Sequence, residues 1–186
     1  MDSELADFLA SAKRLTEESV VWGDAMPLRI AYYLGAGHAP LQYVSSVRAV
    51  VFREDSVLVV RDAESHFHTL PGGRREAEET PEETLHREVL EETGWTLTHT
   101  CLLGFMHFHH LAPRPDDYAY PYPDFLWLLY AAQADEYVPG ARIPGEYERE
   151  SRFRPIAEAR TLLVEQGHLM LLDAAVESRR NAEQHE

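Results

Sequence analysis

Three closely spaced glutamates are the residues of this sequence best placed to do chemistry: Glu88, Glu91 and Glu92. They lie in the segment 80–93, which we expect to be helical. At about 100° per residue, Glu91 and Glu92 then lie about 60° and 40° to either side of Glu88. Three carboxylates on one face repel one another, and such hard oxygen ligands suit Mg²⁺ or Mn²⁺. The alternative is an acidic, solvent-exposed helix face, which is common in glutamate-rich chains.

The wider spacing favours a site over an acidic surface. The pattern is glycine, five residues, glutamate, seven residues, arginine-glutamate, two residues, glutamate-glutamate, one residue, glycine, and its fixed positions are Gly73, Glu79, Arg87, Glu88, Glu91, Glu92 and Gly94. On the order of one chain in 100,000 of this composition should match by chance. A pair between Arg87 and Glu79 could clamp the loop to the helix and orient the metal ligands.

The stretch 73–95 resembles the Nudix box, and it matches at every charged and glycine position. Its one departure is Trp95, where the family usually has a bulky aliphatic residue. The preceding Leu70-Pro71-Gly72 is similar to the family's usual lead-in. With the flanking strands and the final helix, the resemblance covers roughly residues 45–165, the size of an ordinary domain.

This resemblance implies an α/β protein: a Nudix-type α/β/α sandwich with a mixed β-sheet, preceded here by an N-terminal helical extension. It implies hydrolysis of a pyrophosphate bond in a nucleoside diphosphate-linked or nucleoside triphosphate substrate, with Mg²⁺ or Mn²⁺ as cofactor. Glu88 and Glu92 would be the main metal ligands, with Glu91 close by. The carbonyl of Gly72 would complete the coordination, and Arg87 would give support by pairing with Glu79.

A general base should come from a different element, because the helix carboxylates serve as ligands. Nudix relatives often supply a glutamate from a loop shortly before a final aromatic-plus-helix segment, which here is 152–155. Glu148 is favoured by its distance from Phe153, and Glu146 is second. The alternative is that this loop is simply acidic and exposed.

Four further residues are candidates for substrate binding. Arg74 and Arg75 follow the glycine pair and could clamp phosphates, or could balance the surrounding glutamates. His109, or its neighbour His110, could contact phosphates, and a solvent-edge or pocket-lining role is favoured over a zinc site. Tyr118, in the loop 112–124, could stack on a nucleobase, or that loop could be a packed lid or a dimer contact.

Hydrophobic periodicity and turn residues predict the elements that position these side chains. We expect helices over 3–16, 80–93, 156–165 and 169–180, and strands over 47–53, 57–61, 66–70, 96–111 and 125–134. Thr80 and Glu83 form the capping box of the second helix, and Gly94 ends it. Residues 20–43 are expected to be a linker or a short strand region.

This organisation predicts two parts, an N-terminal helix and linker at 1–42 and a Nudix hydrolase domain at 43–186. Apolar residues recur at helical spacing in the first helix, at Leu5, Phe8, Leu9, Ala12 and Leu15. Such a stripe packs either on its own core or on a second copy of the chain. A homodimer is the partner expected in the second case.

The net charge of −15 disfavours a nucleic acid polymer as partner, because the surface repels phosphate backbones. The expected partner is a small-molecule nucleotide, bridged to the acidic protein by metal ions. No membrane-spanning run occurs, and the single cysteine fits a cytoplasmic location.

The alternative to an enzyme is a non-catalytic Nudix-fold regulatory protein that binds a nucleotide. The sequence leaves a nucleotide sugar, ADP-ribose and a modified nucleoside triphosphate open as substrates.

Overall fold

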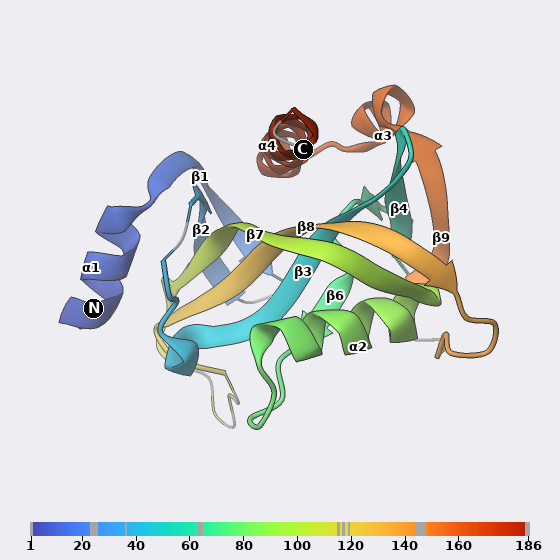
Figure 1. Ribbon diagram of the computed structural model, residues 1–186. Helices are drawn as coiled ribbons and strands as arrows, with labels where there is room; N and C mark the ends of the chain where they lie inside the picture. Colours follow the sequence, from blue (N-terminus) through green and yellow to red (C-terminus); the bar gives the residue numbers. More distant parts are fainter. Residues whose placement is uncertain are drawn as a thin grey trace.

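A nine-stranded sheet lies between helices on both of its faces in the computed structural model (Figure 1). The structure describes residues 2–22, 26–35, 37–62, 65–114, 116, 118, 120–143 and 148–184. In chain order the elements are α1 (Ser3–Ser11), β1 (Lys13–Trp22), β2 (Met26–Leu34), the 3-10 turn η1 (Leu41–Tyr43), β3 (Val44–Arg53), β4 (Ser56–Asp62), β5 (Phe67–His68), β6 (Gly72–Arg74), α2 (Pro81–Thr93), β7 (Trp95–His110), β8 (Asp124–Tyr137), β9 (Glu148–Pro155), α3 (Ile156–Leu162) and α4 (Gln166–Glu183).

The sheet is mixed, as expected. Its strand order is β1-β2-β7-β8-β3-β4-β5, and β3 runs parallel to β8 while the other pairs are antiparallel. The β3 and β4 strands pair only beside their turn, at Phe52–Val57 and Arg53–Ser56. Farther from the turn β3 pairs with β6, while β4 pairs with β9 along its whole length, from Ser56 to Asp62. The glycine strand β6 is thus held against β3, at the place where the sheet divides.

Two hydrophobic cores confirm the α/β/α sandwich. One core joins the sheet to α3 and α4 and includes Phe108, Leu171 and Leu172. The other joins the opposite face to α1 and α2, through residues such as Leu5 and Leu85. Figure 1 shows α2 on one side of the sheet and α3 with α4 on the other.

The predicted signals at both ends of α2 are confirmed. The Thr80 side chain accepts a hydrogen bond from the Glu83 amide (3.2 Å), and the Glu83 carboxylate accepts one from the Thr80 amide (2.8 Å). Gly94 ends the helix in the left-handed region, at φ +79°. Leu85 and Val89 are fully buried against the sheet. This packing fixes which face of the helix carries the glutamates.

Of the two alternatives expected for residues 20–43, a linker or a short strand region, the structure shows strands: the described part of this region contains the end of β1 and the whole of β2. The β1 and β2 strands pair along their length, and β2 lies inside the sheet between β1 and β7. The first helix ends at Ser11, so Leu15 belongs to β1. Leu15 is apolar because it packs on a hydrophobic core, but it does so from a strand. Its match to the helical spacing was therefore coincidental.

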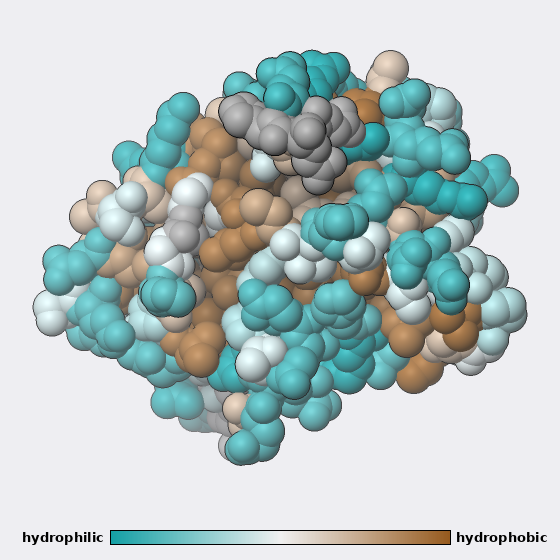
Figure 2. All heavy atoms as spheres, in the orientation of Figure 1, coloured by the Kyte–Doolittle hydropathy of each residue, from teal (hydrophilic) through white to brown (hydrophobic). Residues whose placement is uncertain are grey.

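The apolar stripe of α1 packs within its own chain. Leu5 and Phe8 are buried, and the Phe8 ring lies 4.6 Å from that of Phe105. These apolar residues, from which a homodimer was expected, are thus covered by the chain itself. The homodimer stays a prediction. Figure 2 shows hydrophobic residues on the visible face between α1 and α4. No helix in the described ranges is long and apolar enough to cross a membrane.

Candidate active site

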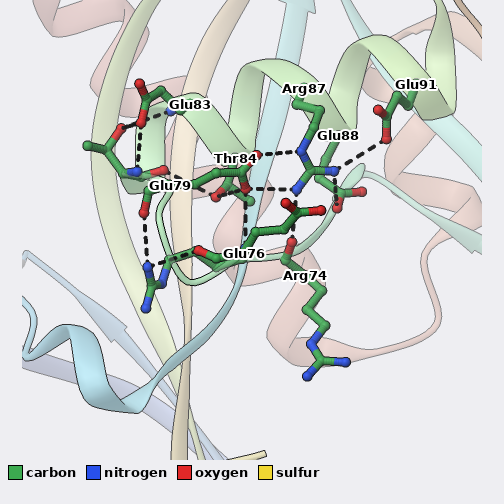
Figure 3. A network of polar contacts seen from close by, with 10 residues as sticks. Arg74, Glu76, Glu79, Glu83, Thr84, Arg87, Glu88 and Glu91 are labelled. Carbon is green, nitrogen blue, oxygen red and sulfur yellow. Dashed lines mark hydrogen bonds and ion pairs between the residues drawn. The ribbon is translucent and has the colours of Figure 1, made fainter.

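The guanidinium of Arg87 lies at the centre of the candidate site (Figure 3). Its Nε and Nη2 atoms donate to the two carboxylate oxygens of Glu79, at 2.6 and 2.8 Å. Its Nη1 donates to Glu88 (2.8 Å) and to Glu91 (3.3 Å), while Nη2 also reaches the carbonyl of Arg74 (3.1 Å). One cation therefore joins the loop, the glycine strand and the acidic face of α2, and the expected pair with Glu79 is present.

Hydrogen bonding to Glu79 fixes the loop that precedes α2. The Arg87 guanidinium lowers the pKa of Glu79 from 4.5 to about 2, and the same contacts raise the pKa of Arg87. The Thr84 hydroxyl and the Glu76 amide also donate to this carboxylate, at 2.8 and 3.2 Å. The carboxylate is consequently ionised at neutral pH and holds loop and helix together.

Arg75 is engaged with the same loop. Its guanidinium donates to backbone carbonyls at 2.9–3.5 Å, namely those of Leu41, Val44, Glu76, Ala77 and Glu79. These contacts give Arg75 a loop-holding role. Its predicted contact with substrate phosphates remains a prediction, and Arg74 is the better placed of the two arginines.

The glycine pair gives the carboxylates room. A Cβ atom at Gly73 would lie 2.2 Å from an Oε of Glu88, and one at Gly72 would lie 2.3 Å from the Val47 carbonyl. Gly72 has φ +132°, and its amide donates to Glu92 Oε2 at 2.8 Å. Glu88 and Glu92 thus both rest on β6, and the side chain at 73 must be absent. The motif showed that glycine is required here, but only the structure shows the contact with Glu88.

The donor set fits a hard divalent cation. Glu88, Glu91 and Glu92 supply carboxylate oxygens within two turns of one helix, which is the ligand type that Mg²⁺ and Mn²⁺ prefer. The space beside Gly73 would be filled by any Cβ. Across the described residues, however, no three acidic, histidine or cysteine side chains converge into a formed metal-binding group. The predicted ligand role of the Gly72 carbonyl therefore remains a prediction.

Arg74 connects the acidic face to a cleft. It lines one cavity of about 370 Å³ together with Glu88 and a second of about 470 Å³ together with Trp22, Trp127 and Tyr118. Figure 3 shows its side chain leaving the Arg87 network, and its guanidinium lies 4.8 Å from the centre of a tyrosine ring, that of Tyr120. Two predicted substrate residues, Arg74 and Tyr118, therefore meet in one cleft.

His109 has a different environment. Its Nδ1 lies 2.7 Å from Asp124 Oδ1, which also lies 2.8 Å from His107 Nε2. Asp124 is almost completely buried; burial acts to raise its pKa, but the two imidazole hydrogen bonds outweigh this and lower it. His109 is not among the described residues that line the two cavities, so its contact with phosphates stays a prediction.

The segment that follows β8 and leads towards the predicted base contacts the C-terminal end of α2. The Arg142 Nε donates to the Glu92 carbonyl (3.0 Å), and the Ile143 amide donates to the Glu91 carbonyl (2.8 Å). Residue 148 begins β9, where its backbone pairs with that of Asp62. The Glu148 side chain and the whole of Glu146 lie outside the described parts of the chain.

The family model for the NUDIX domain matches residues 42–176, so the chain belongs to this family. A Bacillus subtilis (strain 168) protein named "Putative ADP-ribose pyrophosphatase YjhB" is 34% identical over 76 residues, which are 41% of this chain and 36% of that protein. A "MutT-like protein" of Streptomyces ambofaciens is 52% identical over 56 residues, or 30% of this chain and 36% of that protein. The matched part spans little more than a third of both relatives.

Solved structures show the same fold. A NUDIX hydrolase from Nitrosomonas europaea superposes with a TM-score of 0.57 at 20% identity, over 73% of this chain and 90% of that one. An ADP-ribose pyrophosphatase from Streptococcus suis 89-1591 gives a TM-score of 0.51 at 18% identity, with the same coverage of 73% and 90%. The resemblance carried by residues 73–95 is therefore confirmed at the level of family and fold.

Proposed function

We propose that this chain hydrolyses a pyrophosphate bond in a nucleotide substrate, with Mg²⁺ or Mn²⁺ as cofactor. The observation that carries the proposal is the contact of Arg87 with Glu79, Glu88 and Glu91, beside the glycine strand on which Glu92 rests. This arrangement holds Glu88 beside a cavity that it shares with Arg74, with Glu91 and Glu92 on the same helix. An acidic surface helix would not need such a clamp.

Glu88, Glu91 and Glu92 would hold the metal. When bound, Mg²⁺ or Mn²⁺ neutralises pyrophosphate oxygens and lowers the pKa of a bound water. The protein's own contribution is positioning: Arg87 and Glu79 keep the helix and the loop in register. Hydrogen bonds that orient the metal-binding side chains commonly decide how well they hold the metal.

Arg74 is the cation that we propose contacts the substrate. It is exposed, it lines both cavities, and it lies beside the acidic face. A positive group at this position offsets repulsion between the substrate phosphates and a chain of net charge −15. Tyr118 lines the same cleft and would contact the organic part of the substrate.

Glu148 is our proposed general base. The contacts of Arg142 and Ile143 with the carbonyls of Glu92 and Glu91 hold the start of its loop at the C-terminal end of α2. A carboxylate at the first residue of β9 comes from outside the ligand set and would accept a proton from water. Glu146 is the second candidate.

The substrate belongs to the class of nucleoside diphosphates linked to another group or to nucleoside triphosphates. The names of the two relatives, one an ADP-ribose pyrophosphatase and one MutT-like, support testing both kinds.

We also propose a cytoplasmic location, which is supported by the single cysteine of the sequence. A small-molecule nucleotide is then the expected partner.

The proposal is tested by a substrate panel of ADP-ribose, a nucleotide sugar and nucleoside triphosphates. Each is incubated with the full chain in Mg²⁺, in Mn²⁺ and in EDTA, and the products are separated by chromatography. We expect cleavage between phosphorus atoms for at least one substrate, its loss in EDTA and its return with metal. Nucleotide binding without cleavage of any substrate would instead identify a non-catalytic regulator.

A further inference from the structure

Trp22 is a cleft residue whose ring is packed against other aromatic rings and is still widely exposed. It ends β1, in the hairpin that precedes the region matched by the family model at 42–176. Its ring lies nearly parallel to that of Phe108, with centroids 5.8 Å apart and planes at 13°. Nevertheless 45% of the residue remains exposed. One face of the indole is therefore packed, and much of the remaining surface is open.

The rings beneath Trp22 keep it in place. Phe125 lies 4.6 Å from Phe108 and is almost parallel to it, at 4°. The edge of Trp127 meets Trp22, with centroids 5.5 Å apart and planes at 61°. Because large aromatic neighbours restrict the indole, a planar ring could stack on it with little loss of side-chain freedom.

The open side of Trp22 faces the cleft that leads to the acidic helix. Trp22 and Trp127 line both the cavity of about 470 Å³ that contains Arg74 and a second cavity of about 530 Å³. Arg74 in turn shares its other cavity with Glu88. The lining residues of these two adjoining cavities thus lead from Glu88, past Arg74, to the ring of Trp22. Predominantly apolar cavities of this size with a few polar groups are typical of small-molecule sites.

We propose that the N-terminal hairpin supplies the base-binding surface of this protein, with Trp22 as the platform on which the nucleobase stacks. The proposal rests on the proposed function in so far as the substrate is a nucleotide. Phosphates at Arg74 and a base on Trp22 would occupy the two ends of one cavity. The ring touches no reacting atom, so it acts in substrate binding and specificity.

The test measures binding without hydrolysis. AMP is titrated into the full-length Glu88→Gln protein in EDTA, with Trp22 intact, as Trp22→Leu and as Trp22→Phe. Stacking on an aromatic side chain is sequence-tolerant and strong enough that its loss weakens AMP binding by about tenfold or more in Trp22→Leu. Trp22→Phe should recover most of the affinity. Ribose 5-phosphate, which has a phosphate and no base, should bind all three proteins equally.

Kinetics of the otherwise native protein give a second readout. Trp22→Leu should raise KM for the best base-containing substrate by about tenfold and leave kcat within about twofold, because the contact is equal in ground and transition states. Val21→Ala is the matched control. Val21 is the neighbouring exposed residue of β1, at 64%, and it does not line the described cavities. It should change neither constant.

Two results would overturn the inference. One is equal AMP affinity with Trp22 intact and as Trp22→Leu, with unchanged melting temperatures. The other is a change of oligomeric state in Trp22→Leu with AMP affinity retained, which would make the ring a contact between two copies of the chain. If AMP binding depends on Trp22 but no substrate is cleaved, the platform stands and the proposed hydrolase activity fails.

Discussion

Arg87 of α2 donates two hydrogen bonds to Glu79, eight positions earlier in the preceding loop, from Nε at 2.6 Å and from Nη2 at 2.8 Å. The remaining donor, Nη1, holds Glu88 and Glu91. A planar fork with this reach is specific to arginine. The position of the acidic face thus depends on the geometry of one guanidinium as well as on its charge.

Arg87→Lys should therefore lower kcat by about 10- to 100-fold, the usual effect of losing a residue that orients catalytic ligands. Lysine retains the charge but cannot contact both oxygens of Glu79 and also bridge Glu88 and Glu91. The measurement is steady-state hydrolysis of the best substrate of the panel. Arg160→Lys, at an exposed pair with Asp173, is the control and should be neutral. Wild-type turnover in Arg87→Lys would show that the fork is not needed.

The low pKa of Glu79 predicts how stability depends on pH. The folded-state pKa, about 2, lies below the ordinary value of 4.5, so the ionised carboxylate stabilises the folded chain. This contribution is complete above about pH 4.5 and is lost as the pH falls through the folded-state pKa. Chemical denaturation between pH 7 and pH 2 should show a smaller acid-dependent loss of stability for Glu79→Gln than for the wild type. If the free energy of unfolding falls with pH equally in the two proteins, the Glu79 carboxylate is not a source of the acid-dependent loss of stability.

Gly73→Ala tests the contact between β6 and Glu88. A Cβ there would meet the carboxylate at 2.2 Å, and because the obstacle is the end of a side chain, Glu88 must move while the fold survives. We expect at least a tenfold loss of kcat with little change in melting temperature. Gly37→Ala is the control, because a Cβ at Gly37 meets nothing within 4 Å. Unchanged activity in Gly73→Ala would mean that this position of the Glu88 carboxylate does not matter.

The predicted base is tested by Glu148→Gln, with Glu146→Gln, two residues earlier in the sequence, as the comparison. Loss of a general base should lower kcat by about a hundredfold, leave KM within about threefold and alter the acidic limb of the pH–rate profile. Glu146→Gln should then be close to wild type. If both variants keep turnover within about threefold, a small effect on the activation scale, the base lies elsewhere.

The sequence predicted the parts of the fold that depend on local patterns. The capping box of Thr80 and Glu83, the glycine stop at Gly94 and the pair of Arg87 with Glu79 all follow from residue type and spacing, and all are present. The layered architecture followed from the Nudix resemblance. These features could be predicted because each is encoded within a few turns of one helix or within one motif.

The missed strands are those whose stability comes from the sheet and not from local pattern. The β9 strand has the sequence ERESRFRP, and its many charged residues obscure the alternation of apolar and polar residues that marks a strand. Its strand conformation is stabilised by pairing with β4. Similarly, β1 is an edge strand with mostly exposed residues. The partnership of His109 with Asp124 was also missed, since it joins two strands across a long loop.

The cleft could not have been predicted for the same reason. Trp22, Arg74 and Trp127 come from three separate strands, and only the topology of the sheet brings them together. No short-range pattern marks Trp22 as a neighbour of the Nudix box. The sequence suggested the same substrate-binding role for Arg74 and Arg75. The contacts of Arg75 with five backbone carbonyls show that it holds the loop, whereas Arg74 lines the cleft.

The most direct test of the central claim is the turnover of Glu88→Gln with the best substrate in saturating Mg²⁺. Glutamine keeps the shape of the side chain and removes the charge, so we expect kcat to fall at least about a hundredfold while the melting temperature without metal stays near that of the wild type. Glu78→Gln, an exposed residue of the same motif region, should retain full turnover. A Glu88→Gln protein that hydrolyses its substrate at the wild-type rate would contradict the account and place the catalytic centre outside this helix face.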